Sequence, residues 1–255
     1  MGARAVRIVC GLGAFVAIAI TTMSLIEWIG KTTESSTRTV DARAITAIDV
    51  RTKVGAIVVV GGDQDTIEIR RRASFTFAEP SFDETTENGT LTLDAHCGRT
   101  AFGSCDVSYS ITVPRGVTVR ARSGGGSISV RDVEGAVDIY SSVGRVRADR
   151  LGGALRIASS AGSVDASNLR SPTVDANTSA GSVRVSFTAA PGSVRATSDA
   201  GSVTVTVPED ATVYRVEAET SVGSTRVRVR TDPTSPRSIT VNSSAGSVTV
   251  DYLNG

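Results

Sequence analysis

Apolar and polar residues alternate in short segments between residues 119 and 250. Seven glycines divide this region, and apolar residues recur two and usually four positions after each glycine, as at Val164 and Ala166. A second alternating segment ends shortly before each glycine, as at Leu155 and Ile157. A period of two predicts strands with one buried face, and the region lacks the 3.6-residue period of a helix. Each unit is therefore predicted to be strand, turn, strand, turn.

The glycines belong to a short phrase, Ser-Ala-Gly-Ser-Val in its clearest copies, that returns after 18, 18, 19, 20, 22 and 23 residues. Such a short period is typical of stacked-repeat architectures. Glycine suits a tight corner because it takes positive φ without a Cβ clash, and a Ser or Thr three positions earlier can hydrogen-bond the turn. A corner rich in serine and glycine could also be a binding surface. The turn glycines are Gly126, Gly144, Gly162, Gly181, Gly201, Gly223 and Gly246.

The side chain six positions before each glycine alternates in charge through six successive units. In parallel, in-register rungs, equivalent residues stack about 4.8 Å apart, where like charges repel. An antiparallel meander would give these positions no reason to alternate. The pattern predicts an all-β, single-stranded parallel β-solenoid (β-helix) with rungs of 18 to 23 residues over 119–255, with two or three sides per rung. The charge ladder is Arg120, Asp138, Arg156, Asp175, Arg195 and Glu217.

The N-terminal segment has no charge from residue 8 to residue 26. A helix of this length nearly spans a bilayer core of about 30 Å, and Arg4 and Arg7 before it favour an N-terminus inside the cell. We expect a cytoplasmic tail at 1–7, one transmembrane anchor at 8–30 and a polar linker at 31–41. A cleaved signal segment is the alternative, but the apolar stretch is long and no small-x-small site follows it. Either reading exports the rest, and the anchor predicts a single-pass protein of the bacterial cell membrane with an extracytoplasmic C-terminal domain.

Residues 42–118 continue the strand pattern less regularly. We interpret them as irregular N-terminal capping rungs with an insertion, because the end rungs of solenoids are usually atypical. The insertion holds Phe75, Phe77 and Phe82 after three arginines. A hydrophobic lid over the first rung is the favoured interpretation, and a binding patch is the alternative.

Cys97 and Cys105 are close in sequence and are the only cysteines after the apolar N-terminal segment. In an exported domain such a pair predicts a disulfide. His96 beside Cys97 allows a metal site as the alternative, but three ligands fall short of a structural zinc site.

Few residues suggest chemistry. The chain has one histidine, and its glycines match neither a phosphate-binding loop nor a calcium-binding nonapeptide. The net charge is +1 and acidic and basic residues are interleaved, so the sequence lacks the basic patch that nucleic-acid binding requires. We predict no catalytic, cofactor-binding or metal-binding residues and no cofactor. Paired carboxylates that act on polysaccharides are a less favoured alternative.

Recurrent Gly-Ser-Val strands, an N-terminal apolar segment and the lead-in Val113-Pro-Arg-Gly-Val117 resemble the "putative adhesin" β-strand-repeat family of bacterial cell-envelope proteins. The resemblance covers about residues 45–252. It implies a right-handed parallel β-solenoid displayed at the cell surface with an adhesive or envelope-associated role, and it supplies no catalytic residues.

The leading functional hypothesis is a non-enzymatic, membrane-tethered solenoid that binds a protein or envelope component. The alternative is an accessory or sensor subunit of an envelope-stress system, which would act through the membrane helix because the tail has only seven residues. Only a few residues follow the last predicted strand. The last rung is therefore either covered by these residues or open as a docking edge, which would allow a homo-oligomer.

Overall fold

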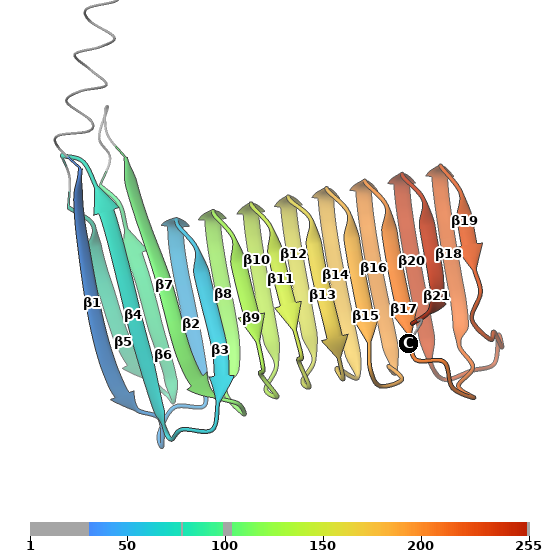
Figure 1. Ribbon diagram of the computed structural model, residues 1–255, viewed down its shortest axis with the longest axis horizontal. Coiled ribbons are helices and arrows are strands. Elements are labelled where there is room, and N and C mark those ends of the chain that lie inside the picture. The colour runs from blue at the N-terminus through green and yellow to red at the C-terminus, as the bar shows by residue number, and fades with distance from the viewer. Residues whose placement is uncertain (1–30, 78, 99–103, 254–255) are drawn as a thin grey trace, which may run out of the picture.

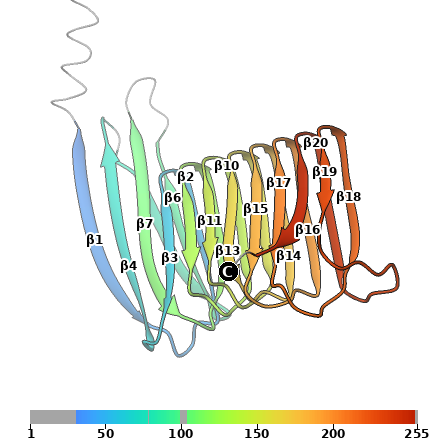
Figure 2. The same ribbon diagram turned by 45° about the vertical axis from the view of Figure 1, so that its right-hand side comes forward.

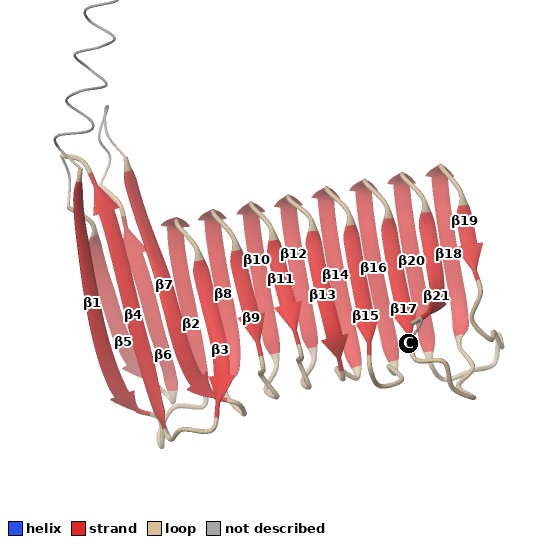
Figure 3. Cartoon of the chain, viewed as in Figure 1, coloured by secondary structure: helices blue, strands red, loops and turns tan. Residues whose placement is uncertain are grey.

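The computed structural model describes residues 31–77, 79–98 and 104–253. These residues form two long β-sheets that lie face to face and run the length of the molecule (Figures 1 and 3). The predicted tail at 1–7 and anchor at 8–30 lie outside the described residues. Within the described ranges, no helix is long and apolar enough to cross a membrane.

The regular rungs have two sides, one strand in each sheet. Neighbouring rungs pair in parallel and in register, so that Asp138 lies between Arg120 and Arg156. The ten-stranded sheet contains β8 (Thr118–Gly125), β10 (Val137–Val143), β12 (Leu155–Ala161), β14 (Thr173–Ala180) and β16 (Ser193–Ala200). The eleven-stranded sheet contains β9 (Ile128–Arg131), β11 (Val146–Asp149), β13 (Val164–Leu169), β15 (Val183–Phe187) and β17 (Val203–Val207).

The last two rungs exchange places relative to the chain order. The rung of β20 (Ser238–Ala245) and β21 (Val248–Tyr252) lies between β16/β17 and the outermost rung of β18 (Arg215–Val222) and β19 (Thr225–Val227). The expectation that Glu217 stacks directly on Arg195 is therefore wrong, because Thr240 pairs with both.

Burial of apolar surface explains this exchange. The interior positions of β20 and β21 are Ile239, Val241, Val248 and Val250, all fully buried between two neighbouring rungs. The outermost rung places Ala218 and Thr225 at equivalent positions. Burying the more apolar rung gains more than an exposed Arg–Glu pair, which is worth roughly 0–1 kcal/mol.

The N-terminal end contains a similar exchange and then changes to antiparallel pairing. The rung of β2 (Ala47–Val54) and β3 (Ile57–Gly62) lies between β8/β9 and the rung of β6 (Thr90–His96) and β7 (Cys105–Pro114). Outside it, β4 (Thr66–Phe75) pairs antiparallel with β7, and β5 (Ser81–Glu87) pairs antiparallel with β6.

Residues 31–41, predicted to be a linker, are instead almost entirely strand β1 (Thr32–Asp41), which pairs antiparallel with β4 along its whole length. The segment is polar and nearly all exposed, which hid it from a hydrophobic pattern. Its threonines favour extended structure, and the free edge of β4 supplies backbone partners.

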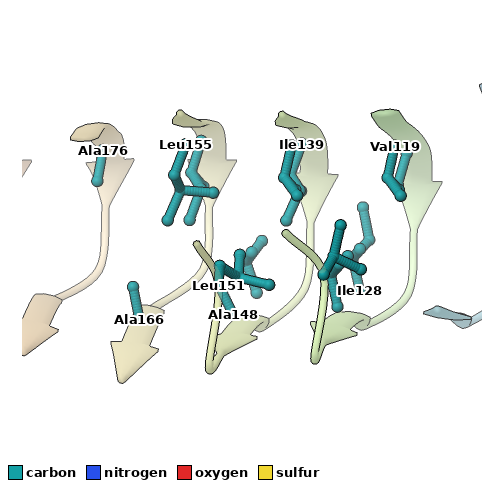
Figure 4. Close-up of a cluster of buried hydrophobic side chains, with 14 of the residues drawn as sticks. Val119, Ile128, Ile139, Ala148, Leu151, Leu155, Ala166 and Ala176 are labelled. Atoms are coloured by element: carbon teal, nitrogen blue, oxygen red, sulfur yellow. The ribbon is translucent and has the colours of Figure 1, made fainter. Parts of the chain in front are cut away.

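The core is a row of aliphatic side chains between the sheets. Figure 4 shows Val119, Ile139 and Leu155 from one sheet directed toward Ile128 and Ala148 of the other. A further buried row lies where the rungs end, away from the turn glycines. The sequence pattern missed this row, which consists of Val133, Leu151, Leu169, Phe187 and Val207.

The charge ladder has the expected register along five rungs. Arg120, Asp138, Arg156, Asp175 and Arg195 are successive in-register neighbours, and Asp49 adds a further acidic rung beside Arg120. Within the described residues, no ion pair of 4.0 Å or less joins neighbours in this ladder. Its contribution is therefore to register more than to stability.

We expect Asp175→Arg to destabilise the fold by on the order of 1 kcal/mol, because it stacks three arginines on rungs about 4.8 Å apart. The loss should shrink as salt screens the repulsion. Thermal unfolding of the variant and the wild type at low and high salt measures it. Equal melting shifts at both salt concentrations would contradict a stacked ladder.

Candidate binding surfaces

The turn glycines form one straight row, here called the arch, at the upper edge of the solenoid in Figure 1. The seven predicted glycines and Gly55 all have φ between 138° and 156°. At Gly144 a Cβ atom would clash with the backbone of Gly126, 2.7 Å from its carbonyl carbon. The same clash with the preceding rung recurs along the row, so the arch is flat and closely stacked.

Buried hydroxyl side chains beneath the arch donate hydrogen bonds to its backbone carbonyl groups. Ser198 Oγ donates to the carbonyl oxygen of Gly181 at 2.8 Å, and Ser243 Oγ donates to that of Gly201 at 2.9 Å. Thr178 and Thr220 make the same bond to the glycine of the neighbouring rung. The serine and threonine column thus joins rungs together, a role beyond the local turn bond that the sequence suggested.

We expect Ser198→Ala to cost about 1 kcal/mol, because it removes a buried hydrogen bond and leaves the Gly181 carbonyl with one partner fewer. Ser141→Ala is the matched control, since Ser141 is fully buried in the same column and its hydroxyl has no partner. Urea unfolding of both variants measures the difference. Equal losses would show that the inter-rung bond contributes nothing.

The opposite edge of the solenoid, here called the loop edge, carries the turns between successive rungs (Figure 2). Asp132, Arg150 and Asn168 stand there with φ of 60°, 51° and 54°. This left-handed conformation is uncommon for residues other than glycine. It redirects the chain so that the following residue, such as Leu151, enters the buried row.

The side chains of these residues build a charged network across rungs. Arg150 donates to both carboxylate oxygens of Asp132, at 2.7 and 2.9 Å, and also pairs with Asp149. Asp149 accepts bonds from Ser167 and Asn168, each at 2.8 Å.

The network continues on both sides. Arg115 pairs with Asp63 at 2.8 Å, and Arg170 pairs with Glu134. A groove of about 460 Å³ follows this edge, and its lining is Arg115, Asp132, Glu134, Arg150, Asn168, Arg170 and Thr188.

Neighbouring arginines lower the pKa of two carboxyl groups in the network. The hydrogen bond from Arg150 lowers the pKa of Asp132, although partial burial opposes the shift. The hydrogen bond from Arg115 similarly lowers the pKa of Asp63. The groove therefore presents fixed guanidinium and carboxylate groups side by side, which suits recognition of a polar, hydrogen-bonding partner.

Phe75, Phe77 and Phe82, for which a binding patch was the alternative to a lid, do not form one surface. Phe75 and Phe82 are partly buried against the core, and the Arg71 guanidinium lies 3.4 Å from the centre of the Phe82 ring. Glu84 pairs with Arg38 at 2.6 Å and with Arg71 at 3.4 Å, which closes this end of the solenoid. Phe77 alone is exposed, at 67%.

The predicted disulfide between Cys97 and Cys105 is present, with the Cα atoms 6.0 Å apart. It occupies both thiols that the alternative metal site would need. His96 is exposed, with Nε2 3.3 Å from Asp83 and 3.7 Å from Asp94. In the described ranges, no cluster of three or more histidine, cysteine, aspartate or glutamate side chains has a geometry suited to a metal ion.

Comparison with known proteins agrees with the family resemblance read from the sequence. The family model Toastrack DUF4097 matches residues 99–253, more than half of the chain. No curated protein matches.

Two examples represent the solved structures that are similar to this chain. One is a "putative cell adhesion protein" from Clostridium sporogenes, with 12% identity and a TM-score of 0.42, covering 87% of this chain and 100% of that one. The other is a "putative adhesin" from Bacteroides fragilis, with 14% identity and a TM-score of 0.44, covering 86% of this chain and 97% of that one.

Proposed function

This chain belongs to the Toastrack DUF4097 family, and we propose that it is a non-catalytic binding protein of the bacterial cell envelope, anchored in the membrane by residues 8–30. Its solenoid would hold the loop-edge groove away from the membrane, toward a polar partner. This proposal depends on one observation, namely the edge of the solenoid at which the first strand begins.

The register of the first strands fixes that side. Thr32 pairs with Phe75, and Phe75 pairs with Cys105. Tyr109, four residues later, pairs with Ile57, which directly follows the arch. The arch glycine Gly55 lies against the backbone of Val107, two residues after Cys105. Strands β1, β4 and β7 therefore extend beyond the arch by about 7 Å, as Figures 1 and 2 show. An anchor that precedes Thr32 would place the arch on the membrane side.

The loop edge would then face outward along the whole solenoid. Its groove contains charged side chains from several successive rungs, held in place by ion pairs. Rigid positioning by paired neighbours lowers the entropy cost of binding. Surface residues positioned by a rigid scaffold are a common arrangement for recognition.

We expect Arg150→Gln with Arg170→Gln to weaken binding to envelope components at least about tenfold, because both guanidinium groups leave the groove. The matched control is Arg147→Gln with Arg184→Gln, which removes two exposed arginines from the flat face of the eleven-stranded sheet. The full-length protein in mild detergent is assayed against isolated envelope fractions and a glycan array, with circular dichroism to verify folding.

Absence of binding by the wild type to any envelope fraction, glycan or host surface would contradict the proposal. An equal loss of binding affinity in both double variants would show that the loop edge is not the binding surface. Carbonate extraction of cell membranes tests the anchor separately, since an anchored chain remains in the pellet. Recovery of only a membrane protein, through residues 1–30, would favour the accessory or sensor subunit instead.

A further inference from the structure

The C-terminal end of the solenoid exposes its core. Strands β18 and β19 are the outermost strands of their sheets. Val216 and Ala218 are only partly buried, and Val227 is 39% exposed. The equivalent interior positions of the rung of β16 and β17, such as Ala196 and Val205, are fully buried. A groove of about 650 Å³, lined in part by Val216, Val227 and Val229, lies at this end.

The two ends of the molecule differ. The N-terminal end is closed by polar antiparallel strands and by the Arg38–Glu84 pair, which is a common way to protect a sheet edge. The last described residues do not close the other end, because Leu253 hydrogen-bonds back to Val207. Strand β21 pairs with β17 on one side and β19 on the other. An apolar core and the free edges of β18 and β19 thus remain together at one end, above a segment in which Thr231 pairs with Tyr214 just before β18.

Near the arch, the outward side chains of this end carry opposite charges on the two sheets, whereas Arg215 at the start of β18 is basic and exposed. Glu217 and Glu219 project from β18, whereas Arg226 and Arg228 project on the β19 side. Arg228 already pairs with Asp251 at 3.2 Å. Glu219 and Arg226 take part in no ion pair among the described residues.

Their heights on the two strands correspond. Glu219 lies four residues before Gly223 and Arg226 lies three residues after it, so the two outward side chains stand at similar distances from the arch. Glu217 and Arg228 share the next outward level. An acidic edge and a basic edge therefore stand side by side at the same levels.

We propose that this end binds a second copy of the chain in a twofold dimer, with the axis parallel to the strands. Such an axis places β18 of each copy antiparallel to β19 of the other. Glu219 then faces Arg226 of the second copy, and Glu217 faces Arg228. The same register stacks Ala218 against Val227, so the apolar core continues through the interface.

Other arrangements fit the charges less well. A twofold axis perpendicular to the sheets would pair β18 with β18 and β19 with β19, which brings acidic edges together and basic edges together. Head-to-tail stacking would meet the closed N-terminal end. The proposed axis also leaves both arches, and both Thr32 residues, on the same side of the dimer. That geometry lets both copies enter from one membrane, a point that rests on the proposed anchor.

Cysteine cross-linking tests the register. In full-length protein that carries Cys10→Ser, the double variant Glu219→Cys/Arg226→Cys should form an oxidised dimer in mild detergent. The matched control is Asn177→Cys/Arg184→Cys, which places cysteines at the equivalent outward positions of a covered central rung. The control should remain monomeric on a non-reducing gel. Equal cross-linking of both variants, or efficient cross-linking by Glu219→Cys alone, would overturn the proposed pairing.

Charge exchange tests the electrostatic argument in solution. Arg226→Glu should weaken dimerisation about tenfold in sedimentation velocity, because it places like charges across the interface. Combining it with Glu219→Arg should restore the dimer. A wild type that stays monomeric to high micromolar concentration overturns the proposal, and so does a double exchange that fails to recover. Since binding to envelope fractions is a separate readout, this outcome leaves the proposed function standing.

Discussion

Gly144→Ala should destabilise the solenoid by roughly 3–5 kcal/mol. The residue has φ of 138°, a conformation that side chains rarely adopt, and its added Cβ would meet the backbone of Gly126. That backbone cannot move away freely, because Gly126 N–H bonds to Val143 and Gly144 N–H bonds to Ala161. Relief of the clash requires the rungs to separate, which breaks hydrogen bonds on both sides of the arch.

Gly116→Ala is the matched control, because nothing lies within 4 Å of its added Cβ. It should change stability by no more than about 0.5 kcal/mol. Urea unfolding compares the two variants, and hydrogen exchange locates the damage, since solenoids can unfold locally. If Gly144→Ala unfolds at the same urea concentration as the wild type, the arch backbone can adjust to a Cβ atom at low cost, contrary to the stacked geometry.

The arch and the register were predictable because each depends on a local rule repeated many times. A glycine every 18 to 23 residues marks corners, and alternation around it marks buried faces. Once equivalent positions stack, the alternating charges of Asp138 and its neighbours specify parallel register. Each repeat adds independent support, so single exceptions such as Thr225 did not obscure the pattern.

The exchanged rungs could not be read in the same way. The repeat determines what each rung looks like but leaves open which rung lies next to which when two candidates fit one position. The order at the C-terminal end depends on a comparison of total apolar burial between two rungs. Strand β1 was missed for another reason. An edge strand is stabilised by backbone hydrogen bonds and needs no apolar face, so the hydrophobic pattern could not identify it.

The loop edge was predictable only in part. The alternation of apolar residues was followed only as far as the fourth residue after each glycine. In the structure, a further side chain is buried at the sixth or seventh residue after the glycine. Asp132, Arg150 and Asn168 take positive φ there without being glycine, and the register shifts between Ala166 and Leu169. A recurring polar residue followed by an apolar one, as in Arg150-Leu151, was the signal that could have identified this edge and its charged groove.

The same missed row supplies the last prediction, that Phe187→Ala should cost about 3–5 kcal/mol. Phe187 is fully buried at the loop-edge end of β15 and pairs with Leu169 beyond the register shift. Aliphatic rungs on both sides are tied by parallel hydrogen bonds, so they cannot collapse into the space left by the ring. The control is Tyr140→Ala, since Tyr140 is 47% exposed on the outer face and should cost little. Thermal and urea unfolding compare the pair. If both substitutions cost the same, the buried row at the loop edge would contribute little to the stability of the fold. The inward turn at Asp132, Arg150 and Asn168 would then serve only to present their side chains.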